Sequence, residues 1–62
     1  MKLKEFYEKS YGIRRYEIWY RGRVNVTRCL ADVPEQLHDK KIEELDFEED
    51  NGKIYCTIEL VD

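Results

Sequence analysis

The side chains that could carry out catalysis are few and lie far apart in the sequence. His38 is the only histidine and stands beside Asp39, and residues 30–55 separate Cys29 from Cys56. A nucleophile needs a base within hydrogen-bond distance, and no local pair supplies one. The cysteine spacing matches no zinc or redox motif, and the three glycines form no phosphate-binding loop. We therefore predict no catalytic residues, no bound metal and no cofactor, in a chain that is not an enzyme.

Basic and aromatic residues alternate in the first half of the chain. Arginines interleaved with aromatic side chains on a sheet are the combination with which proteins bind single-stranded nucleic acid. The residues that would carry such binding are Arg15, Trp19, Arg21 and Arg23. The net charge of −3 argues against this function, because nucleic-acid-binding domains are usually basic. Nucleic-acid binding is therefore an alternative and not the first hypothesis.

Acidic residues dominate the second half of the chain. Residues 1–31 carry eight Lys and Arg against three Glu, a net charge of +5, whereas residues 32–62 carry three Lys against eleven acids, a net charge of −8. Alternation along a strand places one set of acids outward together with Tyr55: Glu44, Asp46, Glu48 and Asp50. Outward residues repeat about every 6.6–6.8 Å, much more sparsely than duplex phosphates, so close mimicry of DNA is not supported. Two interpretations stay open: a surface for a partner with a basic groove, or a solvated face that keeps the sheet soluble.

Trp19 is the only tryptophan and falls at an outward position of its strand. Tryptophan and arginine contribute strongly to the binding energy of protein interfaces. We predict that Trp19 faces outward. The alternative is a core position, in which a two-residue loop would turn Trp19 inward toward Val24.

These residues must be positioned by a short helix and two hairpins. Leu3, Phe6 and Tyr7 share one face at helical spacing, and the helix should end near Ser10. From Arg14 the apolar residues repeat with period two, which predicts two strands around Gly22.

The loop of the first hairpin sets the register of its strands. A three-residue loop from Arg21 to Arg23 pairs Tyr20 with Val24 and keeps the apolar side chains of both strands on one face. A two-residue loop would mix polar and apolar side chains on each face. The pattern therefore predicts the three-residue loop or a bulge.

The second hairpin has the clearest turn signal in the chain. Asn51-Gly52 favours a two-residue type I′ turn, which pairs Asp50 with Lys53. This register also groups the apolar residues on one face: Leu45, Phe47, Ile54, Cys56, Ile58 and Leu60. The connection between the hairpins should contain a helical turn capped by Asp32, with Leu37 tucked inward.

Residues 1–62 thus predict a single small α+β domain, a short N-terminal helix packed on a four-stranded antiparallel sheet made of two hairpins. One face of the sheet should remain open. Cys56 should point into the core and Cys29 away from it, so we expect two free thiols. With no apolar run of membrane-spanning length and no signal peptide, we expect a cytoplasmic protein that does not engage a membrane.

The function predicted from these features is that of a non-catalytic protein-binding module. It would be a small acidic inhibitor or modulator of a nucleic-acid-processing protein, acting through the open sheet face. Trp19 and Tyr55 would anchor the partner and the acidic side chains would steer it. The alternatives are single-stranded nucleic-acid binding through the first hairpin and a homodimeric structural protein, because small domains with free sheet edges often self-associate.

Overall fold

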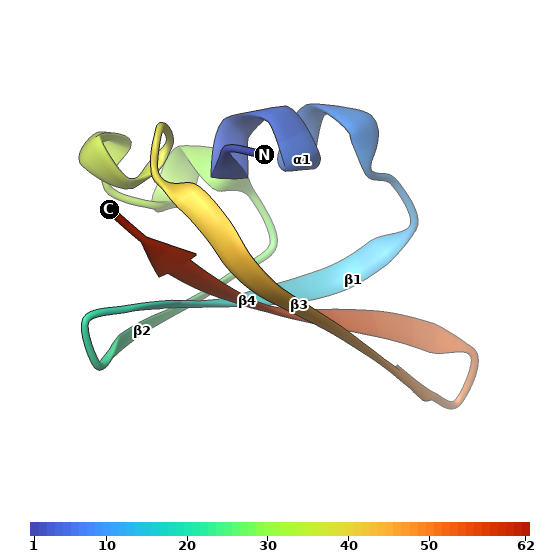
Figure 1. Ribbon diagram of the computed structural model, residues 1–62. Coiled ribbons are helices and arrows are strands. Elements are labelled where there is room, and N and C mark those ends of the chain that lie inside the picture. The colour runs from blue at the N-terminus through green and yellow to red at the C-terminus, as the bar shows by residue number, and fades with distance from the viewer.

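One helical layer covers one face of a four-stranded sheet, and the other face has no cover (Figure 1). The computed structural model describes residues 1–62. The elements are α1 (Leu3–Lys9), β1 (Ile13–Tyr20), β2 (Arg23–Thr27), the short 3-10 turns η1 (Leu30–Asp32) and η2 (Glu35–Leu37), β3 (Lys41–Asp50) and β4 (Lys53–Val61). The predicted α+β class is confirmed.

The sheet is mixed, so the prediction of a purely antiparallel sheet is wrong. Its strand order is β2-β1-β4-β3, and the central strands β1 and β4 run parallel. Each hairpin is antiparallel as predicted, which makes β2 and β3 parallel to each other. Residues 28–40 must therefore cross from one end of the sheet to the other before β3 begins. Parallel strands need a connection of about this length, a dozen residues or more.

Helix α1 follows its predicted pattern. Leu3 is fully buried, and Phe6 and Tyr7 pack against the core. The backbone N–H of Lys2 donates to Glu5 Oε1 at 2.8 Å, which satisfies one free donor at the start of the helix. Ser10 ends the helix, and its hydroxyl lies 2.8 Å from that of Tyr16 on β1.

The first hairpin differs from the predicted register. Tyr20 pairs with Arg23, and Arg21 and Gly22 form a two-residue turn with φ values of 50° and 77°. Positive φ at both central residues is the type I′ geometry, whose twist matches that of the flanking strands. The turn geometry has overridden the apolar phase of β2, and Val24 consequently lies opposite Trp19.

The second hairpin has the predicted register. Asp50 pairs with Lys53, and Asn51 and Gly52 have φ values of 53° and 78°. Near the start of β3 the register shifts between Ile42 and Glu44, which leaves an extra residue in that strand.

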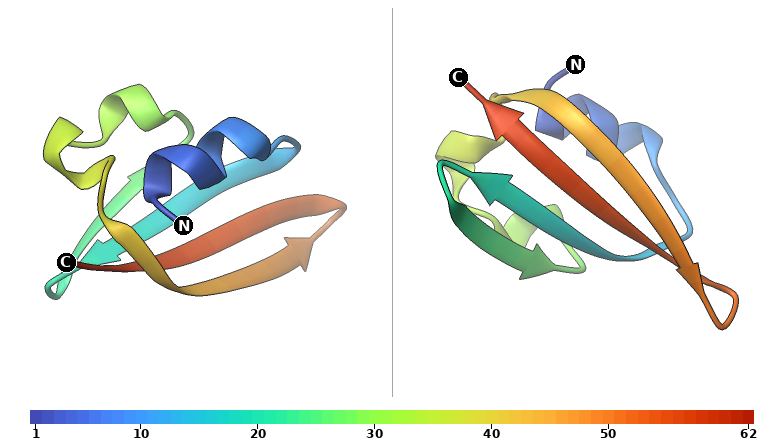
Figure 2. Two further views of the ribbon diagram at one scale, coloured as in Figure 1. Left: turned by 45° about the horizontal axis from the view of Figure 1, so that its top comes forward. Right: turned by 60° about the horizontal axis from the view of Figure 1, so that its bottom comes forward.

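The connection between the hairpins crosses the helix-covered face of the sheet, beside α1 (Figure 2). Val33 and Leu37 are buried there, and the inward position of Leu37 is confirmed. Asp32 lies inside η1 and does not cap the next turn, because η2 begins after Pro34. The Thr27 hydroxyl accepts from the N–H of Cys29 at 3.0 Å, which turns the chain away from β2.

The core lies between the sheet and the helical layer. Its buried apolar residues are Leu3, Tyr16, Ile18, Val33, Leu37, Cys56, Ile58 and Leu60. Cys56 is buried, Cys29 is exposed and both are free, as predicted. No helix of the structure has the length and apolar character that a membrane span needs.

Candidate functional site

The uncovered side of the sheet is a broad surface that the fold leaves without a partner element. We call it the open face, and the right panel of Figure 2 shows it with the helical layer behind the strands. Cross-strand pairing places every second side chain of each strand on it. In sheet order these side chains are Val24 and Val26; Arg15, Glu17 and Trp19; Lys53, Tyr55, Thr57, Glu59 and Val61; and Lys41, Glu44, Asp46, Glu48 and Asp50.

One corner of the open face is apolar. Trp19 lies opposite Val24, and Val26 lies opposite Glu17, so the three apolar side chains are neighbours on β1 and β2. Trp19 is 37%, Val24 43% and Val26 58% exposed. We call these three residues the apolar corner. The opposite side of β2 carries Asn25 and buried Thr27, so this edge strand turns its polar side toward the helical layer and its apolar side toward solvent.

Polar contacts hold the middle of the open face in place. The Arg15 guanidinium lies 4.9 Å from the centre of the Tyr55 ring, and Trp19 Nε1 donates to Glu17 Oε1 at 2.8 Å. A shallow hollow of about 350 Å³ lies beside Arg15 and Tyr55, and four acids line it: Glu17, Glu48, Glu49 and Asp50. One cation and four carboxylates surround the hollow. Because the net charge around it is negative, the hollow favours a cationic side chain.

The far side of the open face is acidic. We call Glu44, Asp46, Glu48 and Asp50, which all project from β3, the acidic row. Glu44 faces Glu59 across the strands, and like charges in this position repel. Only one of the fourteen acidic residues of the chain, Asp62, takes part in an ion pair. The basic half of the chain therefore lies beside the acidic half without pairing directly with the acidic row.

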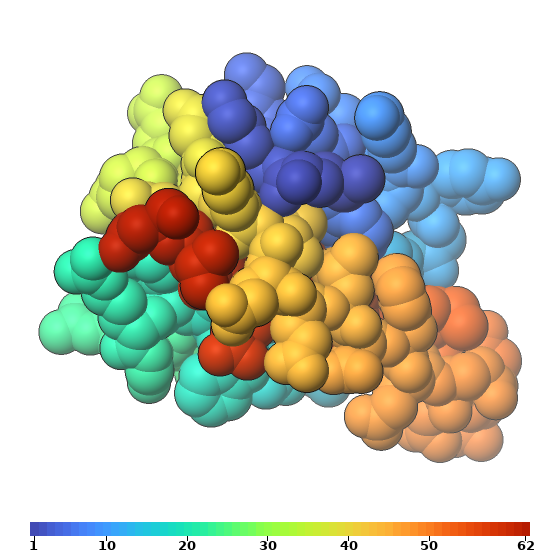
Figure 3. Space-filling model, viewed as in Figure 1, coloured from blue at the N-terminus to red at the C-terminus, as the bar shows by residue number.

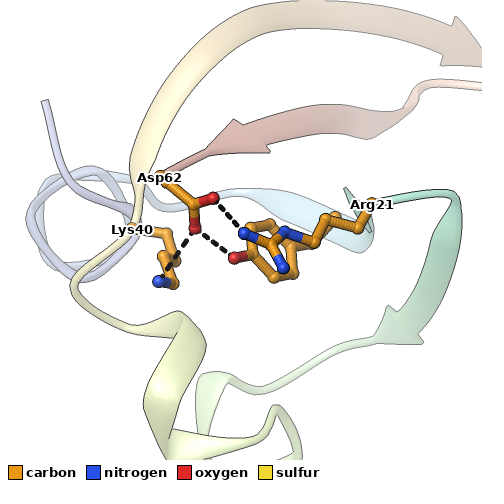
Figure 4. Close-up of polar contacts among 4 residues, drawn as sticks. Arg21, Lys40 and Asp62 are labelled. Carbon is orange, nitrogen blue, oxygen red and sulfur yellow. Dashed lines mark hydrogen bonds and ion pairs between the residues drawn. The ribbon is translucent and has the colours of Figure 1, made fainter.

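The ion pairs of the molecule converge on Asp62, away from the open face (Figure 4). Its carboxylate accepts from the hydroxyl of Tyr20, the guanidinium of Arg21 and, at 3.1 Å, the ammonium of Lys40. These three donors hold the pKa of the Asp62 carboxyl well below its ordinary value. The cluster ties the turn of the first hairpin to the end of β4 and to the residue before β3.

The residues proposed for nucleic-acid binding are not brought together. Arg15 and Trp19 share the open face but are separated by Glu17, whose carboxylate accepts from the indole. Arg21 is held by Asp62, and Arg23 lies opposite Tyr20, whose side chain lies on the helix-covered side. The six residues proposed for protein binding, in contrast, all lie on the open face: Trp19, Tyr55, Glu44, Asp46, Glu48 and Asp50.

The residues considered for catalysis occupy separate environments. His38 Nε2 lies 3.1 Å from the carbonyl oxygen of Val33 within the connection. Burial raises the pKa of the Cys56 thiol to about 11, with a smaller contribution from Asp46. No three side chains among His, Cys, Asp and Glu are grouped as metal ligands would be.

Val24 and Val26 are the surface residues that the sequence pattern placed wrongly. Their alternation with polar residues matched the apolar phase of β1, which assigned them to the core. The available signal was Gly22, because a residue followed by glycine between two strands can close a two-residue turn. With a two-residue turn at Arg21 and Gly22, the register places Val24 and Val26 outward beside Trp19.

The comparisons with known proteins provide no guide to this surface. No protein-family model, curated protein or solved structure matches the chain significantly. The geometry and charge of the open face are therefore the basis for a function.

Proposed function

We propose that this chain is a non-catalytic protein-binding module that engages its partner through the open face. The observation that carries the proposal is the inverted polarity of β2, which exposes Val24 and Val26 beside Trp19. A domain this small would ordinarily gain stability by turning such apolar side chains into its core. An exposed apolar cluster rimmed by polar residues is characteristic of a protein interface.

The charge of the open face favours a basic partner. Its cations are Arg15, Lys41 and Lys53, and its anions are Glu17, Glu59 and the acidic row, which gives a net charge of −3. A homodimer formed face to face would bring two such charges together, so a second copy is a poor occupant. A basic groove would instead gain attraction, and one of its lysines or arginines would fit the hollow beside Tyr55.

The specific form of the proposal is a small acidic inhibitor or modulator of a nucleic-acid-processing protein in the cytoplasm. Proteins that handle nucleic acids present basic grooves, and a surface of net charge −3 with an apolar anchor would block such a groove. The apolar corner would provide the buried contact, and the acidic row would orient and accelerate the encounter.

The test is affinity capture of partners from a lysate of the source cells, with and without nuclease. We expect a stoichiometric protein to remain after nuclease and to be lost with the Val24→Asp variant. Loss of all bound material after nuclease would favour the nucleic-acid alternative. Empty capture in both arms would contradict the proposed function.

Charge-reversal variants test the acidic row with a matched control. Both variants change three exposed acids to lysine; the test set is Glu44, Asp46 and Glu48, and the control set, away from the open face, is Glu8, Glu35 and Asp39. We expect the test set to slow association with the captured partner about tenfold or more at low salt, and the control set to change it little. Equal association rates for both sets would remove the steering role.

A further inference from the structure

β3 is an edge strand, and most of its outer edge has no partner. It is the longest strand of the sheet and pairs only with β4 along its length. Residues at the start of the chain cover its beginning, where the N–H of Ile42 donates to the carbonyl oxygen of Met1 at 2.8 Å and Lys2 bridges Lys41. From Glu43 to Asp50 the edge carries no further strand, and Figure 3 shows this part of the chain, coloured yellow to orange, at the surface.

The turn of the second hairpin determines which backbone groups face this edge. Residues that flank a two-residue turn, here Asp50 and Lys53, exchange hydrogen bonds with each other. Because the bonding direction alternates along an antiparallel pair, the N–H and C=O groups of Leu45, Phe47 and Glu49 point away from β4. They form a row of free donors and acceptors that an extended segment can pair with.

An apolar groove lies beside the same edge, on the helix-covered side. It has a volume of about 330 Å³. Six residues provide its apolar lining: Met1, Phe6, Tyr11, Ile13, Phe47 and Ile54. Phe47 is 56% and Met1 61% exposed, and the rings of Phe47 and Phe6 lie 6.3 Å apart. A strand added next to β3 would place one inward side chain directly beside Phe47.

The other side of β3 carries the acidic row. An added strand would therefore have carboxylates beside its side chains on the open face and an apolar groove beside its side chains on the helix-covered face. The acids also prevent two copies of β3 from pairing, since like charges across strands repel.

We propose that the free edge of β3 binds an extended segment of the protein partner in which basic and apolar residues alternate. The basic side chains would pair with the acidic row, and the apolar side chains would enter the groove at Phe47. Main-chain hydrogen bonds to Leu45, Phe47 and Glu49 would supply affinity, and the alternating side chains would supply specificity. This inference rests on the proposed function in assuming a protein partner and in using the acidic row. Its binding edge and its groove are separate from the apolar corner.

The test uses a synthetic seven-residue peptide, acetyl-Lys-Val-Lys-Phe-Lys-Val-Lys-amide, titrated into the isotope-labelled chain and followed by NMR. We expect saturable binding that slows amide hydrogen exchange at Leu45, Phe47 and Glu49. A peptide of the same composition with its lysines in one block carries the same charge but cannot present two distinct faces. We expect it to bind about tenfold more weakly or worse.

Two variants locate the binding site of the alternating peptide. Phe47→Ser should weaken binding about tenfold by removing the exposed ring, whereas Val24→Asp, on the far strand, should leave it unchanged. A loss of binding with Val24→Asp would overturn the edge assignment.

Three further results would also overturn the proposal. The first is equal binding of both peptides, and the second is absence of protection at the three amides. The third is protection of these amides that rises with protein concentration when no peptide is present, which would assign the edge to a second copy. Capture of a partner through the apolar corner would survive each of them, so the two proposals can fail separately.

Discussion

Val24 is the residue whose position most clearly separates a surface role from a core role. It is 43% exposed, whereas Val33, in the connection, is buried in the core. We expect Val24→Asp to lower the free energy of unfolding by no more than about 1 kcal/mol, because the new carboxylate remains in water. Val33→Asp would bury the same carboxylate and should cost several times as much.

Urea denaturation of both variants makes the comparison. A large loss of stability with Val24→Asp would mean that β2 turns its valines toward the core, as the three-residue loop would require.

The two cysteines should differ sharply in reactivity. Cys56 is buried and its pKa is raised to about 11, whereas Cys29 is exposed. Only the thiolate reacts with iodoacetamide, so at pH 8 we expect Cys29 to be alkylated while Cys56 stays largely unmodified. In urea both should react. Mass spectrometry of the alkylated chain measures this, and equal rates in the folded state would contradict the burial of Cys56.

Asp62 should contribute stability that depends on pH. Its pKa is lowered in the folded state by Tyr20, Arg21 and Lys40, so its contribution is complete above the ordinary aspartate pKa. It is lost as the pH falls through the lower folded value. We expect Asp62→Asn to destabilise the chain at pH 7 and to have a smaller effect at pH 3.

Thermal unfolding at both pH values tests the role of Asp62. Asp39→Asn, which removes an exposed carboxylate without an ion-pair partner, is the matched control. An unchanged difference between wild type and Asp62→Asn across this range would show that the cluster does not form.

At the level of elements, the two hairpins depend on their turns. Gly52 has φ of 78°, and a side chain there would meet no neighbouring atom, so any cost of Gly52→Ala is conformational. We expect this substitution to lower the free energy of unfolding by about 1 kcal/mol, since L-residues disfavour positive φ. Replacement by D-alanine in a synthetic chain keeps the φ preference and should be neutral or stabilising. Equal losses for both forms in urea denaturation would rule out the type I′ turn.

The elements also show which parts of the fold local sequence patterns can predict. Asn51-Gly52 and the apolar phase of β4 agreed, and the second hairpin was predicted with its register. In the first hairpin these two signals conflicted, and the turn at Gly22 decided the register that the apolar phase had misassigned. The parallel pairing of β1 with β4 requires residues 28–40 to cross the sheet. This crossing is a non-local arrangement, in which Val33 and Leu37 become buried, and local sequence signals do not determine it.

The same distinction applies to the candidate site. Trp19, Tyr55 and the acidic row were predicted to face outward because strand alternation alone determines their side. The apolar corner and the groove at Phe47 were not predicted, because both depend on how separate elements meet.

At the scale of the whole molecule, the two oppositely charged halves lie side by side in the sheet. Their charges of +5 and −8 are not cancelled by direct contact, since Arg21–Asp62 is the only ion pair that joins them. The acidic row and the apolar corner therefore remain available on a face with no covering element. This arrangement underlies the proposal that the open face binds a basic protein surface.

The most direct test of that claim is a hydrogen-exchange footprint of the captured partner on the intact chain. We expect protection on β2 and β3, the two edge strands that border the open face, with little change in α1. We also expect the Val24→Asp variant to abolish the footprint. Protection confined to α1 and residues 28–40, with the strands unaffected, would contradict binding through the open face.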